Sequence, residues 1–126
     1  MARADPKPEV RGAEPTYPLG MVLSACPDIV DYARGGISNW RDLVATASVV
    51  RGMLGISPNA WEEAQSVMGE TQAAVVVGCI LQRGEAIHSA GGYLRELTRK
   101  AGAGEFSLGP ILMALINARN REKKRA

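Results

Sequence analysis

The fold can be inferred first from TQAAVVVGCILQ, residues 71–82, because every position from Ala73 to Leu81 is apolar or glycine. A helix that is apolar on nearly every side belongs in the middle of a domain, surrounded by other helices. The run AAVVV would also suit a buried strand, since β-branched residues favour strands. The continuous length, the helical patterns around it and the lack of any partner strand favour a helix, with Thr71 as its expected cap.

Upstream of this stretch, short apolar runs alternate with residues that start and stop helices. We expect four short helices over residues 19–25, 28–32, 39–54 and 59–68. Ser38 is the predicted N-cap of the third helix, and Ser57 followed by Pro58 predicts the start of the fourth. Gly55 and Gly69 are expected to end these two helices.

Downstream, the segment SAGGYLRELTRKAGAGEFSLGPILMAL (residues 89–115) predicts two helices separated by the glycine-rich turn AGAG. Ser89 is the expected cap of the first helix and Ser107 that of the second. The apolar spacing predicts two inward-facing sets: Tyr93, Leu94, Leu97 and Ala101 in the first helix, and Leu108, Ile111, Leu112 and Leu115 in the second. The whole pattern therefore predicts an all-α fold, a compact bundle of about six short helices.

The first sixteen residues differ in composition from the rest. They contain three prolines, mixed charge and almost no apolar content, which is typical of a disordered linker. We therefore expect a disordered linker over 1–16, a helical domain over 17–118 and a basic tail over 119–126. A linker at this position also suggests a C-terminal piece of a longer protein, with a free N-terminal tail as the alternative.

The residue types that carry catalysis or bind cofactors are scarce. The single histidine, His88, lies in an expected turn, and Glu62 and Glu63 are adjacent, so a helix directs them about 100° apart. Cys26 and Cys79 match no metal-binding spacing and are expected to be reduced thiols. We expect no enzymatic activity, no cofactor and no metal.

The predicted location of the chain is the cytoplasm. No segment has the pattern of a signal peptide. The longest apolar stretch, Ala73 to Leu81, is about half of the roughly 20 residues that a membrane-spanning helix needs.

Charge is distributed unevenly along the chain. Residues 1–82 hold six Lys/Arg and nine Asp/Glu, a balance of −3, whereas residues 83–126 hold nine Lys/Arg and four Asp/Glu, a balance of +5. Arg95 and Arg99 are four residues apart and share one helix face, while Glu96 is expected to pair with Lys100. The cations Arg119, Arg121, Lys123, Lys124 and Arg125 then form a basic C-terminal helix end.

Such cations can neutralise the phosphates of nucleic acid without reading its sequence. The candidate contact residues for DNA or a partner protein are Arg95, Arg99, Arg119, Arg121, Lys123, Lys124 and Arg125. A solvated helix face and a frayed terminus are the alternatives. A protein partner would instead use Trp40, Trp61 or Tyr17, because aromatic residues dominate interface energetics, although burial in the core is the simpler role for each.

Several blocks of the sequence resemble, in the same order, the C-terminal domain of RepC, the replication initiator of repABC-type bacterial plasmids. They are YPLGMVLSACPDIVDYARGGISNWRDLVATASVVRGMLGISPNAWEEAQSVMG (residues 17–69) and AAVVVGCILQRGEAIHSAGGYLRELTRKAGAGEFSLGPILMAL (residues 73–115). The resemblance implies a role in plasmid replication. It also implies that the winged-helix-like region credited with origin binding in RepC lies outside this sequence, so origin recognition does not carry over.

These observations lead to one expected function and two alternatives. We expect a non-catalytic module of a plasmid replication initiator that contacts plasmid DNA through its backbone, or other replication proteins. A self-association or protein-interaction module without DNA affinity is the first alternative. An inactive fragment of an initiator gene is the second.

Overall fold

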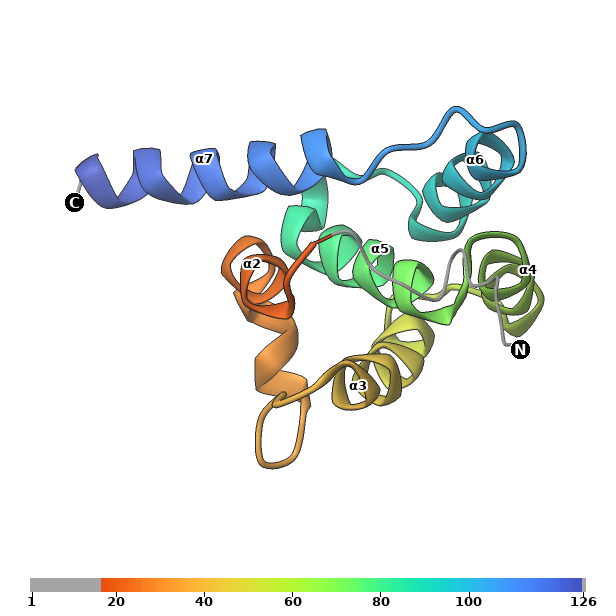
Figure 1. Cartoon of the computed structure of the whole chain (residues 1–126), viewed down its shortest axis with the longest axis horizontal. Helices are drawn as coiled ribbons and strands as arrows, with labels where there is room; N and C mark the ends of the chain where they lie inside the picture. Colours follow the sequence, from red (N-terminus) through yellow and green to blue (C-terminus); the bar gives the residue numbers. More distant parts are fainter. Residues whose placement is uncertain (1–16, 126) are drawn as a thin grey trace, which may run out of the picture.

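The computed structural model describes residues 17–125, with only the backbone for Arg125, and these residues form helices and no strand (Figure 1). In chain order the helices are α2 (Leu19–Ala25), the 3-10 helix η1 (Pro27–Tyr32), α3 (Trp40–Met53), α4 (Pro58–Met68), α5 (Glu70–Arg83), the 3-10 helix η2 (Gly84–Ala86), α6 (Ala90–Gly102) and α7 (Gly109–Arg125). The predicted all-α class is therefore confirmed. The predicted linker over 1–16 lies outside the described residues.

Helix α5 is the centre of the bundle, as its sequence predicts. All eight residues from Ala73 to Ile80 are buried, and α5 contacts every other described helix. Figure 1 shows α5 in the middle, with α2, α3, α4, α6 and α7 arranged around it. The strand alternative for the run AAVVV is wrong, because these valines pack on neighbouring helices all round α5 rather than on a sheet.

Two of the predicted serine caps are confirmed. The Ser57 hydroxyl accepts a hydrogen bond from the Ala60 amide at 3.1 Å, and the Ser89 hydroxyl accepts one from the Gly92 amide at 3.1 Å. Each bond satisfies an amide that the first turn of the helix leaves without a partner.

The prediction of Ser38 as a cap is wrong by one residue. The Asn39 side chain accepts from the Asp42 amide at 2.8 Å, and the Asp42 carboxylate accepts from the Ser38 amide at 2.9 Å. This reciprocal pair satisfies two amides at once, in the manner of a capping box, so α3 begins at Trp40.

Thr71 and Ser107 also do not act as the predicted caps. Helix α5 begins at Glu70, because Gly69 alone separates it from α4 and adopts a φ of 89° that favours glycine. Helix α7 begins at Gly109, two residues after Ser107. Tyr17 approaches this position closely, since a Cβ on Gly109 would lie 3.3 Å from the tyrosine hydroxyl.

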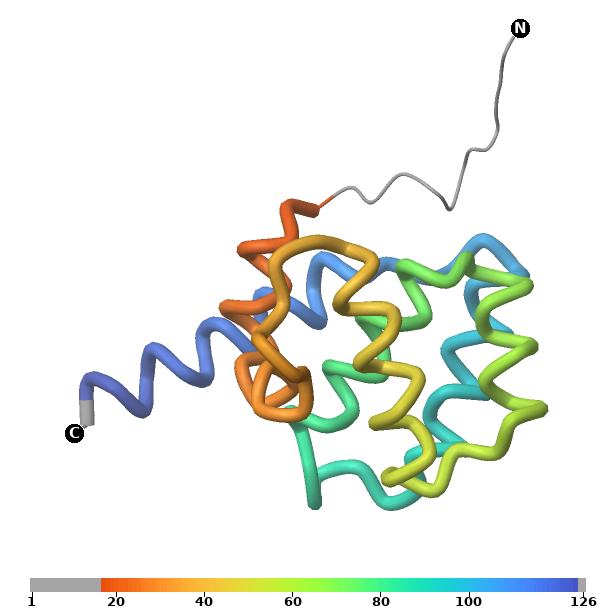
Figure 2. Tube along the Cα trace, turned by 90° about the horizontal axis from the view of Figure 1, so that it is seen from below, coloured from red at the N-terminus to blue at the C-terminus, as the bar shows by residue number. Residues whose placement is uncertain are grey.

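Four of the five outer α-helices form two pairs, which lie on opposite sides of α5. Helix α4 packs on α6 at one end of the molecule, and α2 packs on α7 at the other (Figures 1 and 2). Beyond α2, the C-terminal half of α7 projects away from the body of the bundle. Within residues 17–125, every helix is too short or too polar to cross a lipid bilayer.

Candidate nucleic-acid interface

The seven predicted contact residues fall into two separate groups. Arg95 and Arg99 lie on α6, whereas the other five lie on the C-terminal half of α7. Both views place α6 and the C-terminal end of α7 at opposite ends of the molecule (Figures 1 and 2). The structure therefore does not bring the seven cations onto one surface, and each group must be considered alone.

The two arginines on α6 point to solvent, as predicted, but carboxylates already engage them. The Arg95 guanidinium lies 3.5 Å from a carboxylate oxygen of Glu63, which belongs to α4. Arg99 donates two hydrogen bonds to Glu96, at 2.7 and 3.2 Å. The predicted pairing of Glu96 with Lys100 is wrong. The guanidinium of Arg99, which is one residue closer to Glu96 in the sequence than Lys100 is, donates to both oxygens of the Glu96 carboxylate.

The α4–α6 pair carries no net charge. Helix α6 holds three cations and one carboxylate, and α4 adds two carboxylates and no cation, so three positive charges meet three negative ones. The hydrogen bonds from Arg99 lower the pKa of Glu96, which keeps this carboxylate ionised at neutral pH. An anionic polymer would gain little by approaching this end of the molecule.

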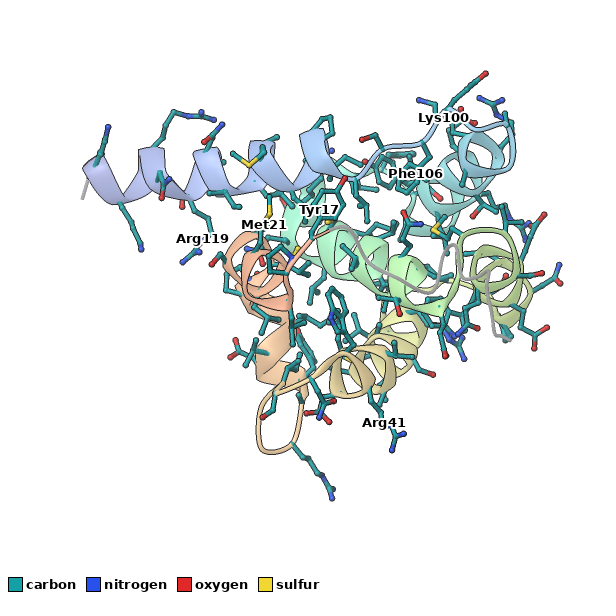
Figure 3. All side chains as sticks on the ribbon, viewed as in Figure 1. Tyr17, Met21, Arg41, Lys100, Phe106 and Arg119 are labelled. Atoms are coloured by element: carbon teal, nitrogen blue, oxygen red, sulfur yellow. The ribbon has the colours of Figure 1, made fainter. Side chains whose placement is uncertain are left out.

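On α7, Arg119 has a structural role. Its guanidinium donates a hydrogen bond to the backbone carbonyl of Ser24, in the last turn of α2. Figure 3 shows this side chain directed from α7 toward α2. A carbonyl at a helix C-terminus has no partner within the helix, so Arg119 satisfies it and holds α7 against α2.

Beyond Arg119, the described cations make no such bond within residues 17–124. Arg121, Lys123 and Lys124 are exposed and form no ion pair or side-chain hydrogen bond with any residue between 17 and 124. Arg125 is the last residue of α7, and Glu122 is the only carboxylate from Asn117 to Arg125. Helix α7 continues past residue 119, the predicted start of the tail, so these charges lie on a helix.

The three aromatic residues considered as partner anchors have different positions. Trp61 is buried between the helices, and Tyr17 packs beside Gly109. Trp40 is half-buried beside a shallow hollow on the outside of α3. None is a fully exposed anchor.

The two most exposed large apolar side chains among the described residues lie instead on α3, where no partner anchor was predicted. Val49 is 60% exposed and Met53 is 62% exposed, one turn apart on the outer face of the helix. A sequence signal existed, because neither residue fits the inward stripe that contains Leu43, Ala47 and Val50.

The two thiols form a buried pair. Cys26 and Cys79, 53 residues apart, lie with their sulfur atoms 3.6 Å from each other in the core. The hydrogen bond to Cys79 and burial raise the pKa of the Cys26 thiol far above its usual range, so it is protonated at neutral pH. Among the described residues, no three His, Cys, Asp or Glu side chains come together as metal ligands would.

Comparisons with known proteins point to one family. The family model described as "Replication protein C C-terminal region" matches residues 18–118. A "Putative replication protein C" of Rhizobium rhizogenes is 52% identical over 103 residues, which cover 81% of this chain and 25% of the relative. A protein of the same name from Sinorhizobium fredii is 56% identical over 104 residues, covering 82% of this chain and 26% of the relative.

The chain thus spans about a quarter of the length of these relatives. No solved structure shows a significant match to it. Because the family model covers most of the described helices, this chain belongs to the replication protein C C-terminal family.

Proposed function

We propose that this chain is a non-catalytic module of a plasmid replication initiator, and that it binds the phosphate backbone of duplex DNA through the projecting end of α7. The observation that carries the proposal is the set of exposed cations on that end, Arg121, Lys123 and Lys124, which no described residue neutralises. Family membership supports the replication context. The DNA contact rests on the charges.

The α7 end suits phosphates better than α6 does. Five cations and one carboxylate lie between Asn117 and Arg125, so the helix end has a local charge of +4. It projects from the bundle, which lets a duplex approach without meeting the carboxylates of α4. Arg119 contributes to this charge but mainly holds the helix in place.

A fluorescence polarisation titration against a short random-sequence duplex tests this proposal. Three phosphates neutralised by Arg121, Lys123 and Lys124 predict a slope of log K against log salt of about −2.7. Between about 50 and 200 mM salt the affinity would then fall about 40-fold. The triple variant R121A/K123A/K124A should lose most of this slope.

The double variant R95A/R99A is the matched control, because it also removes arginines from an exposed helix face. We expect its affinity and salt slope to equal those of the unmodified chain, since its cations are already paired. No salt-sensitive affinity in the unmodified chain would refute the proposed function. Loss of affinity in the control alone would move the contact to α6.

A second candidate function, self-association or binding of a replication protein, is favoured by the exposed side chains of α3. Val49 and Met53 place apolar surface on the outside of the bundle, and Val49 lines a shallow hollow together with the half-exposed Tyr32. Light scattering at increasing protein concentration tests it. This function would be favoured over DNA binding if the chain forms a dimer, if the variant V49D/M53D abolishes that dimer, and if the chain has no affinity for DNA.

A further inference from the structure

The outer face of α7 carries uncharged polar residues between its cations. Asn117, Asn120, Arg121 and Lys124 follow the i, i+3, i+4, i+7 spacing, so they share one face of the helix. All four are exposed, and neither asparagine forms a side-chain hydrogen bond with any described residue. The side-chain amides of Asn117 and Asn120 are therefore available to a ligand.

The bond from Arg119 to α2 fixes which way this face is turned. At about 100° per residue, the four side chains lie about 100–160° around the helix from Arg119. Figure 3 shows Arg119 on the side of α7 that meets α2, so the polar face is turned away from the bundle. A ligand on this face would not collide with α2.

The asparagines have no evident role in folding. Asn is among the weaker helix formers, because its side chain competes with the backbone for hydrogen bonds. At exposed positions, where packing does not decide the residue, Ala or Lys would favour the helix more. Two asparagines within four residues are thus better explained by what they can bind.

An asparagine amide presents a donor and an acceptor side by side. This pair matches the N6 amino group and N7 of adenine in the major groove, and Asn-to-adenine is a common specific contact in protein–DNA recognition. Arg121 and Lys124, on the same face, would meet the flanking phosphates. We infer that the outer face of α7 enters the major groove of duplex DNA, where Asn117 and Asn120 read adenines; this inference rests on the proposed DNA contact.

The dimensions of the helix suit this placement. From Asn117 to Lys124 the axis rises about 10.5 Å, at 1.5 Å per residue, which corresponds to about three base pairs. An α-helix with its side chains is about 10–12 Å across, and the major groove is about 12 Å wide. Asn117 and Asn120 are about 4.5 Å apart along the axis, so they face neighbouring base pairs.

The test is selection of binding sites from a random duplex pool by the full chain. We expect enrichment of a short motif with adenines at neighbouring positions, bound about 5- to 150-fold more tightly than its G·C-substituted version for each base that is read. The variant N117A/N120A should lose this preference but keep its affinity for random duplex within about twofold. Far-UV circular dichroism should show an unchanged helix content, since Ala favours helices.

The variant K124A is the matched control, since it removes a phosphate contact from the same face. It should weaken binding to all sequences alike and lower the salt slope by about 1, with the motif unchanged. Binding by the unmodified chain without any enriched motif would overturn base reading and leave the proposed function standing. An enriched motif that N117A/N120A still prefers would overturn the assignment to these residues, and no binding at all would overturn both.

Discussion

Gly78 lies in the interior of α5, at the point where the central helix meets the segment that joins α2 to η1. A methyl group added there would lie 3.6 Å from Cys26 Cβ, 3.6 Å from Ile29 Cδ1 and 3.8 Å from Cys26 Sγ. These are ordinary van der Waals distances, so the methyl group fits without displacing its neighbours. We therefore expect the substitution Gly78→Ala to stabilise the protein.

The size of the gain follows from two contributions. A glycine in a helix interior costs about 1 kcal/mol relative to alanine. Burial of one methyl group adds up to about 0.8 kcal/mol. The free energy of unfolding should rise by about 1–1.8 kcal/mol, equivalent to a Tm increase of about 4 °C or more for a domain of this size.

Gly52→Ala, near the end of α3, is the matched control. No atom lies within 4 Å of the added methyl group at that position, so this variant can gain only the conformational part, about 1 kcal/mol at most. Thermal and urea unfolding followed by circular dichroism would measure both variants. If Gly78→Ala destabilises the protein and Gly52→Ala does not, the described packing of α5 on Cys26 and Ile29 is refuted.

Three further predictions concern single side chains. Native Cys26 and Cys79 should resist iodoacetamide because both are buried and the pKa of Cys26 is raised; mass spectrometry should find two additions only after unfolding, and rapid labelling of the native protein would contradict the buried pair. Arg119→Ala should lower the free energy of unfolding by about 1 kcal/mol because it frees the Ser24 carbonyl, whereas Arg121→Ala should change it by less than about 0.5 kcal/mol; equal losses in urea unfolding would argue against the Arg119 contact. In an NMR pH series, the pKa of the Glu96 carboxylate should lie below its usual value because of its pair with Arg99. The small stability that this pair contributes is complete above the pKa of the unfolded state and is lost as the pH falls through the lowered pKa of the folded state. If Arg99→Ala leaves the titration midpoint of Glu96 unchanged, the pairing is refuted.

Local sequence patterns were sufficient to predict the described α-helices and η1, though not the 3-10 helix η2. Ser57 and Ser89 act as caps because the bond joins a hydroxyl to an amide three residues on, which involves no distant part of the chain. The central position of α5 follows from its uniformly apolar surface. Ser38 fails as a cap because Asn39 beside it is an equally good cap, and Asp42 decides between them by accepting the Ser38 amide.

The candidate site could be predicted only in part, because its electrostatics depend on residues far apart in the sequence. Helical spacing places Arg95 and Arg99 on one exposed face but carries no information that Glu63, 32 residues earlier, lies against it. In the same way, Ser24 is 95 residues from Arg119. Of the candidate contact residues whose side chains are described, only Arg121, Lys123 and Lys124 then have no partner between residues 17 and 124.

We propose that the bundle holds α7 so that its cationic end meets duplex DNA. The most direct test is an NMR titration of the ¹⁵N-labelled chain with a random-sequence duplex, in which each backbone amide reports its own contact. We expect the chemical shift changes to concentrate between Asn117 and Arg125 and to weaken as the salt concentration rises. Changes centred on α6 or α3, or no changes at low salt, would contradict a DNA contact at the end of α7.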